Sequence, residues 1–375
     1  MKKIQMVDLQ TQYTKIKEEI DAGIAEVINS ASFIKGPKVA EFQAHLEQYT
    51  GAKHVINVGN GTDALQIALM GLGLQPGDEV ITPTFTFIAT AEVVALLGLT
   101  PVVVDVDWET MNMDIESVRR AITPHTKAIV PVHLFGQCAN MEAIMELANE
   151  HHLYVIEDAC QAIGAQYTFS NGETKQAGTI GHIGCTSFFP SKNLGCYGDG
   201  GAIFTNDDEL ADKMQAIANH GCHIRYHHDE VGVNSRLDSI QAAILDAKLP
   251  HLNEYIAARQ KAAAYYDKAF ADNEKLLIPG REPHSTHVFH QYTLRVVGAD
   301  RDALREGLAA RGIPAMIYYP VPLHQQKAYL DPRYKDGDFP VAERLAACVL
   351  SLPMHTELDE EQLQFITSSV LDLIR

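Results

Sequence analysis

Hydrophobic and polar positions alternate in two ways between residues 54 and 205. Short runs rich in Val, Ile and other apolar residues are separated by segments in which apolar side chains recur every three to four positions. The short runs predict buried strands, and the longer segments predict amphipathic helices. Their alternation is typical of βα units around a mostly parallel sheet. We predict an α/β domain with seven strands, which begin at His54, Glu79, Pro101, Ala128, Tyr154, Cys185 and Gly201.

The pattern changes after Gly232. Residues 239–270 are rich in Ala, Leu, Ile and Gln and are interrupted at Pro250, which predicts consecutive helices that link two domains. Beyond them, predicted strands at residues 291–297 and 315–319 bracket a helix, and two more helices close the chain. We therefore predict a large domain of residues 1–245 with an N-terminal arm, and a smaller α+β domain of residues 246–375.

Composition narrows the classes of partner. The chain has 375 residues, more than one compact core usually holds, and its 30 basic and 48 acidic residues give a net charge of −18. This charge disfavours nucleic acid and anionic membranes as partners. The six cysteines and seventeen histidines show no metal-binding spacing, and no apolar run is long enough to span a bilayer. We expect a soluble, cytoplasmic protein without a metal site.

The first predicted strand runs directly into the segment Gly59–Ala64. Its glycines allow a tight turn, and Thr62 or Asp63 can cap the helix that follows, so that the helix N-terminus forms an anion site. The spacing also fits the G-x-G-x-x-A pattern of a Rossmann dinucleotide site. That alternative requires an acid after the next strand, whereas Asp78 and Glu79 precede it. A purely structural turn is the third interpretation.

Lys192 follows an apolar strand and lies beside Pro190 in a glycine-rich loop. Such surroundings desolvate the amine and favour the neutral, nucleophilic form that makes a Schiff base. The hydroxyl of Ser187 can donate to a phosphate. A lone lysine in a loop is more often a solvated surface residue, so the assignment depends on its context.

Three further residues supply that context. Asp158 ends a predicted strand, where its carboxylate can keep the ring nitrogen of pyridoxal 5′-phosphate (PLP) protonated, and Gln161 can donate to the phenolic oxygen. Phe87 follows another strand and can stack on a planar ring. The alternatives are that Asp158 caps a turn and that Phe87 is part of the core.

Together these segments resemble the DegT/StrS family of sugar-nucleotide aminotransferases, which have the fold of aspartate-aminotransferase-like PLP enzymes. The resemblance covers essentially the whole chain. It rests on five motifs that occur in the expected order, namely Asn60–Leu65, Glu157–Gln161, Ser187–Asn193, Gly198–Gly201 and Asn234–Ala243.

The resemblance implies a role for each candidate residue. Lys192 would carry PLP and shuttle the proton between donor and acceptor, Asp158 and Gln161 would contact the ring, and Phe87 would stack on it. The phosphate would be held by Gly61, Thr62 and Ser187, and by Asn234 of the other subunit of a homodimer with shared active sites. The substrate would be contacted by Arg236, Tyr318 and Tyr319.

Within the family, four segments look most like the branch that aminates C3 of UDP-2-acetamido-3-keto-hexuronic acid for surface polysaccharides such as O-antigen. These segments are Phe188–Lys192, Leu194–Gly198, Arg225–His228 and Ser351–His355. The resemblance implies glutamate as the amino donor. This branch often has His-Tyr-Pro where the present chain has Tyr318-Tyr319-Pro320, which leaves 3- or 4-amination of a UDP- or dTDP-linked keto-6-deoxy sugar as an alternative.

Two other functions remain open on the sequence. In a PLP enzyme for small amino acids, Arg311 or Arg333 of the small domain would bind the substrate carboxylate. In a regulatory or binding protein built on the same scaffold, no chemistry would take place. The intact pair of Lys192 and Asp158 favours an enzyme.

Overall fold

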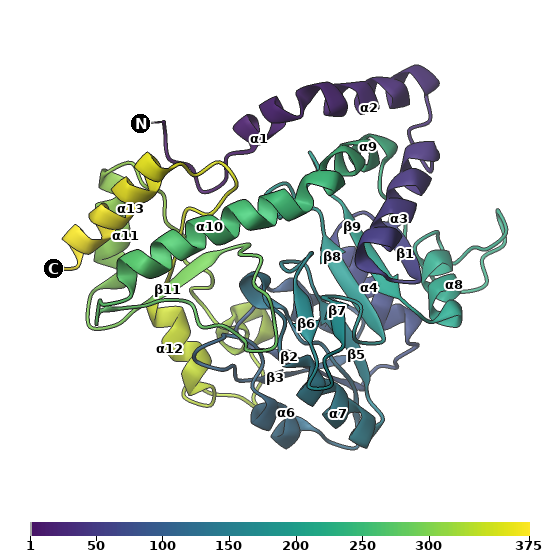
Figure 1. Ribbon diagram of the computed structural model, residues 1–375. Coiled ribbons are helices and arrows are strands. Elements are labelled where there is room, and N and C mark those ends of the chain that lie inside the picture. Colours follow the sequence, from purple (N-terminus) through teal and green to yellow (C-terminus); the bar gives the residue numbers. More distant parts are fainter. Residues whose placement is uncertain (1) are drawn as a thin grey trace.

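The computed structural model describes residues 2–375. Its centre is a seven-stranded sheet in the order β1-β9-β8-β5-β4-β2-β3 (Figure 1). Within this sheet β9 alone runs against the other strands, pairing antiparallel with β1 and β8. The prediction of a mostly parallel, seven-stranded α/β domain is confirmed. The strands are β1 (His54–Val58), β2 (Glu79–Pro83), β3 (Thr100–Val104), β4 (Thr126–Ile129), β5 (Tyr154–Asp158), β8 (Ile183–Ser187) and β9 (Gly201–Thr205).

Helices cover both faces of this sheet, which explains why its strands are apolar nearly throughout. Val155 packs in the core on one face, whereas the next residue, Ile156, packs in the core on the other. The first face is covered by α3 (Pro37–Thr50), α6 (Ile115–Ala121) and α7 (Met141–His151), and the second by α4 (Gly61–Gly71), α5 (Ala89–Leu96) and α8 (Asp208–Ile217). The carboxyl ends of the parallel strands meet at one edge, where the candidate residues lie.

Two consecutive helices leave the large sheet, as the sequence predicted. α9 (Ser239–Lys248) passes through a short 3₁₀ turn (Leu249–His251) that contains Pro250 into α10 (Leu252–Phe270), the long green helix of Figure 1. The proposed domain boundary at residues 245 and 246 falls inside α9, and the division of the chain into two domains stays a prediction.

The C-terminal part contains a separate three-stranded antiparallel sheet in the order β10-β11-β12. This sheet and the helices around it form an apolar core of their own. The elements are β10 (Leu276–Leu277), β11 (Tyr292–Val296), α11 (Arg301–Ala310), α12 (Pro340–Cys348), β12 (Val349–Leu352) and α13 (Glu360–Leu373). The predicted strand at residues 291–297 corresponds to β11.

The strand predicted at residues 315–319 is wrong. Only Met316 pairs with this sheet, through a single bridge to Ser351 of β12. Pro314 and Pro320 flank the segment, and a proline cannot donate to a strand ladder, which limits the pairing. The two tyrosines before Pro320 are thereby left outside the sheet.

The N-terminal arm consists of α1 (Leu9–Lys15) and α2 (Lys17–Ser30), and α2 lies against α9 (Figure 1). Ile16, Ile20 and Ile244 form a small apolar cluster between the arm and α9. The remaining short elements are β6 (Gln166–Thr168), β7 (Thr174–Gln176) and 3₁₀ turns at Leu134–Gly136, Leu323–Gln325 and Lys327–Tyr329. Within residues 2–375, none of the helices combines the length and apolar character that crossing a bilayer requires.

Candidate active site

Lys192 lies in a tight turn directly after β8. The turn is closed by hydrogen bonds from Lys192 N to Phe189 O (2.8 Å) and from Cys196 N to Phe188 O (2.8 Å). Its amine forms no hydrogen bond or ion pair with residues 2–375. Burial lowers the pKa of Lys192, an effect that nearby Cys160 and Asp158 oppose. Burial therefore favours the neutral form of the amine, which can act as a nucleophile or base.

Asp158 ends β5 at the same edge and is only 6% exposed. Its Oδ2 accepts from Thr90 Oγ1 (2.9 Å), and its Oδ1 accepts from the backbone N–H of Cys160 (3.2 Å). Both donors are neutral, and no cation within residues 2–375 pairs with this carboxylate. A buried carboxylate held this way can stabilise a cationic ligand group. Thr90 of α5 is a site residue that the sequence analysis missed.

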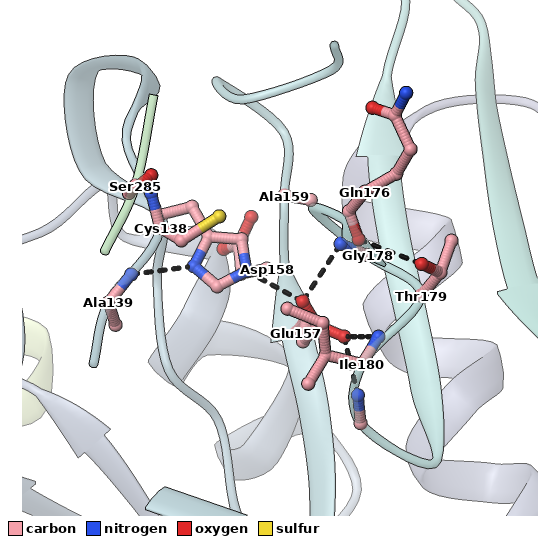
Figure 2. A network of polar contacts seen from close by, with 12 residues as sticks. Cys138, Ala139, Glu157, Asp158, Ala159, Gln176, Gly178, Thr179, Ile180 and Ser285 are labelled. Atoms are coloured by element: carbon pink, nitrogen blue, oxygen red, sulfur yellow. Dashed lines mark hydrogen bonds and ion pairs between the residues drawn. The ribbon is translucent and has the colours of Figure 1, made fainter. Parts of the chain in front are cut away.

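The neighbouring acid, Glu157, points to the opposite face of β5 and is fully buried (Figure 2). Its carboxylate accepts from three backbone N–H groups, those of Gly178 (2.8 Å), Ile180 and Gly181 (both 2.6 Å), and contacts His133 Nε2 (2.7 Å). The N–H of Ala139 donates to His133 Nδ1, so Nε2 carries the proton that binds Glu157. Glu157 therefore fixes the backbone behind the site, while Asp158 faces the site itself.

The start of α4 lies next to the end of β8. A Cβ atom added to Gly61 would lie 2.8 Å from both Cys160 Sγ and Ser187 Cβ, so glycine is needed for this approach. The predicted cap was wrong, because Asn60 is the N-cap and accepts from Asp63 N (2.8 Å). The helix starts two or three residues earlier than a cap at Thr62 or Asp63 implies, which leaves the hydroxyl of Thr62 without a partner in residues 2–375.

Aromatic and amide groups form another wall of the site. Phe87 is 55% exposed, so its ring is accessible for stacking. The amide of Gln161 donates to Tyr319 Oη (3.1 Å), while its oxygen accepts from Phe135 N (2.7 Å). The ring centroid of Tyr319 lies 6.3 Å from that of Phe87 and 5.9 Å from that of Tyr318. The C-terminal part of the chain thus contributes Tyr319 to the site.

Residues 14–371 match the model of the DegT/DnrJ/EryC1/StrS aminotransferase family. The chain belongs to this family. It is 49% identical over 98% of its length to the UDP-2-acetamido-2-deoxy-3-oxo-D-glucuronate aminotransferase of Pseudomonas aeruginosa, 99% of which is covered. It is 48% identical, with 99% of each chain covered, to a Geobacillus stearothermophilus protein named pleiotropic regulatory protein.

A solved structure of NtdA from Bacillus subtilis with bound cofactor PMP is 31% identical to this chain. The TM-score is 0.90, and the match covers 100% of this chain and 85% of NtdA. The resemblance inferred from the motifs is therefore confirmed at the level of the family and of the fold.

In this aminotransferase, the side chains of two predicted residues form no hydrogen bond with the other candidate residues of the same chain. Asn234 is exposed, and the guanidinium of Arg236 forms no hydrogen bond or ion pair with residues 2–375. Ser235 between them accepts from Gly59 N (2.8 Å) and donates to Asp63 Oδ2 (2.6 Å). Both residues are thus anchored beside the turn before α4, with their side chains free.

The two arginines that would bind the substrate in a PLP enzyme for small amino acids are already paired with carboxylates. Arg311 pairs with Asp372 (2.6 Å) and Arg333 pairs with Asp331 (2.7 Å), and both arginines are exposed. Neither is a free cation for a substrate carboxylate, in contrast to Arg236. Within residues 2–375, no three His, Cys, Asp or Glu side chains are grouped so as to hold a metal ion.

Proposed function

We propose that the protein is a PLP-dependent aminotransferase that moves an amino group from glutamate to C3 of UDP-2-acetamido-3-keto-hexuronic acid. The observation that carries this proposal is the meeting of Lys192, Asp158 and the N-terminus of α4 at one edge of the sheet. The activity named for the 49% identical Pseudomonas relative supports the choice of sugar. The PMP-bound relative of the same fold supports the cofactor.

The free groups of the site match the parts of PLP. The start of α4 at Gly61, with the hydroxyls of Thr62 and Ser187, offers donors for a phosphate. Asp158 offers a carboxylate without a cationic partner, and the exposed ring of Phe87 offers a stacking surface. The amine of Lys192 is also unpaired within residues 2–375. Each of these groups therefore keeps a donor, a charge or a surface for the cofactor, whereas the amide of Gln161 already donates to Tyr319.

When bound, PLP supplies the electron sink that stabilises the carbanion formed by loss of the α-proton of the amino donor. Lys192 carries the proton, because its amine is neutral when desolvated and can take the proton and later return it. Asp158 would keep the ring nitrogen of PLP protonated, and Thr90 and the N–H of Cys160 hold that carboxylate in place. Phe87 would stack on the planar ring, and Tyr319, which accepts from Gln161, would help to exclude water beside it.

Substrate turnover by the purified protein tests this proposal. With PLP, glutamate and UDP-2-acetamido-3-keto-glucuronate, we expect 2-oxoglutarate and a 3-amino sugar, identified by mass spectrometry. The UDP-linked 3-keto sugar without the C6 carboxylate and a dTDP-linked 4-keto-6-deoxy sugar serve as comparisons. Faster turnover of either one would reassign the sugar. Absence of turnover with every keto-sugar would favour a regulatory role, which the name of the Geobacillus relative suggests for that protein.

We also propose a homodimer in which Asn234 completes the site of the other subunit. Mixing Lys192→Ala with Asn234→Asp, each nearly inactive alone, should restore about a quarter of the wild-type activity. Random exchange makes half of the dimers hybrid, and each hybrid has one intact site of two. Activity is measured after subunit exchange has been verified with differently tagged chains. If Asn234 served its own chain, mixing would restore nothing.

A further inference from the structure

The turn that carries Lys192 is tightly packed against its own backbone. A Cβ added to Gly195 would lie 2.3 Å from Pro190 O, so the two arms of the turn are in direct contact. Cys196 Sγ also contacts Phe188 O at 3.0 Å. Because the turn is so compact, a shift of Gly195 must move Pro190 and, with it, the start of the Lys192 side chain.

Lys248, the last residue of α9, is buried against this turn. It is 1% exposed, its Nζ donates to Gly195 O at 2.7 Å, and it lies 4.5 Å from the centroid of the Tyr197 ring. Burial lowers its pKa to about 8, opposed by Cys196. No carboxylate within residues 2–375 pairs with this amine. A buried cation without a counter-ion costs free energy, so its presence at this position calls for a role other than stability.

Two further contacts show that the turn is held from both sides. Gln241 lies seven positions before Lys248 on the same face of α9, and its Oε1 accepts from Tyr197 N at 2.8 Å. On the other side, Asn193 Nδ2 donates to Val288 O at 2.9 Å. The backbone around Lys192 is therefore fixed between α9 and the segment that leads into β11.

We propose that Lys248 is a positioning residue for Lys192, which acts by holding the carbonyl of Gly195 and thereby the geometry of the turn. It contacts neither cofactor nor substrate. The inference rests on the proposed function, because it takes Lys192 as the reactive lysine. A merely structural Lys248 would affect stability and leave the reactivity of Lys192 as it is.

Lys248→Met and Lys248→Gln separate these two roles. Met keeps much of the length and volume without a donor, and it removes a buried charge, so the melting temperature should stay within a few degrees of wild type or rise. PLP capture at Lys192 of the apo-protein is trapped with borohydride and followed by peptide mass. Its rate and kcat should each fall about 10- to 100-fold, while KM for the sugar changes less than about twofold. Lys248→Gln, a neutral donor, should recover part of both losses.

Two control variants complete the experiment. Ile244→Val lowers stability from the same helix, and Lys261→Met removes an exposed lysine from α10; both should capture PLP at the wild-type rate. If Lys248→Met captured PLP at the wild-type rate and kept the wild-type kcat, the inference would be overturned. It would also be overturned if Ile244→Val showed the same losses at equal stability. Trapping of the wild type at a lysine other than Lys192 would instead contradict the proposed function, and this inference with it.

Discussion

Replacement of Lys192 by alanine should lower kcat by at least about 10⁴-fold, the largest effect expected of any single change in this protein. The variant loses the group that anchors PLP and the base that moves the proton. No neighbour can replace it, since the other buried amine, that of Lys248, is committed to Gly195. Single-turnover kinetics with glutamate measure the loss, and the visible absorbance of PLP bound at Lys192 should disappear.

Lys192→Arg and Lys261→Ala are the matched controls for this prediction. Arginine has a similar length but stays protonated and cannot form a Schiff base, so it should be as inactive as alanine. Lys261 is exposed on α10, and its replacement should leave turnover unchanged. A Lys192→Ala variant that keeps a tenth of the wild-type activity would show that another residue carries the proton.

The large sheet could be predicted from the sequence because each of its strands is buried on both faces. Such strands appear as short, continuous apolar runs, and seven of these were visible. The segment 315–319 has the same apolar character, yet its pairing is limited by flanking prolines and by the single bridge between Met316 and Ser351. The outer side of β12 is open to pairing, so the prolines of the segment, and not the lack of a neighbouring strand, limit it to one bridge.

The candidate site was predictable where a residue ends a strand, as Asp158 and Ser187 do. Thr90 and Lys248 lie within helices, and only the folded chain brings them to Asp158 and Gly195. A signal for Lys248 was present, because it interrupts the apolar face that Leu245 and Leu249 share. A lysine on a buried helix face indicates a specific partner, but the sequence does not say which one.

The two acids at the end of β5 give the second large prediction, because they differ in role and not in chemistry. Asp158→Asn removes the negative charge that faces the site, and kcat should fall by about 10²- to 10³-fold while the protein stays folded. The amide can accept from Thr90 or from Cys160 N, so the local backbone should be retained. Asp158→Glu keeps the charge at a displaced position and should lose less activity.

Glu157→Gln, one residue earlier, should show the opposite pattern. Its new amide nitrogen must face Gly178 N, Ile180 N or His133 Nε2, each of which already donates to this side chain, so a buried donor is left unpaired. The melting temperature should fall by several degrees, whereas kcat at a temperature where the variant is folded should stay within a few-fold of wild type. Thermal melts and steady-state kinetics on both variants measure the difference. If Glu157→Gln were the less active and Asp158→Asn the less stable, the carboxylate that serves the chemistry would be Glu157.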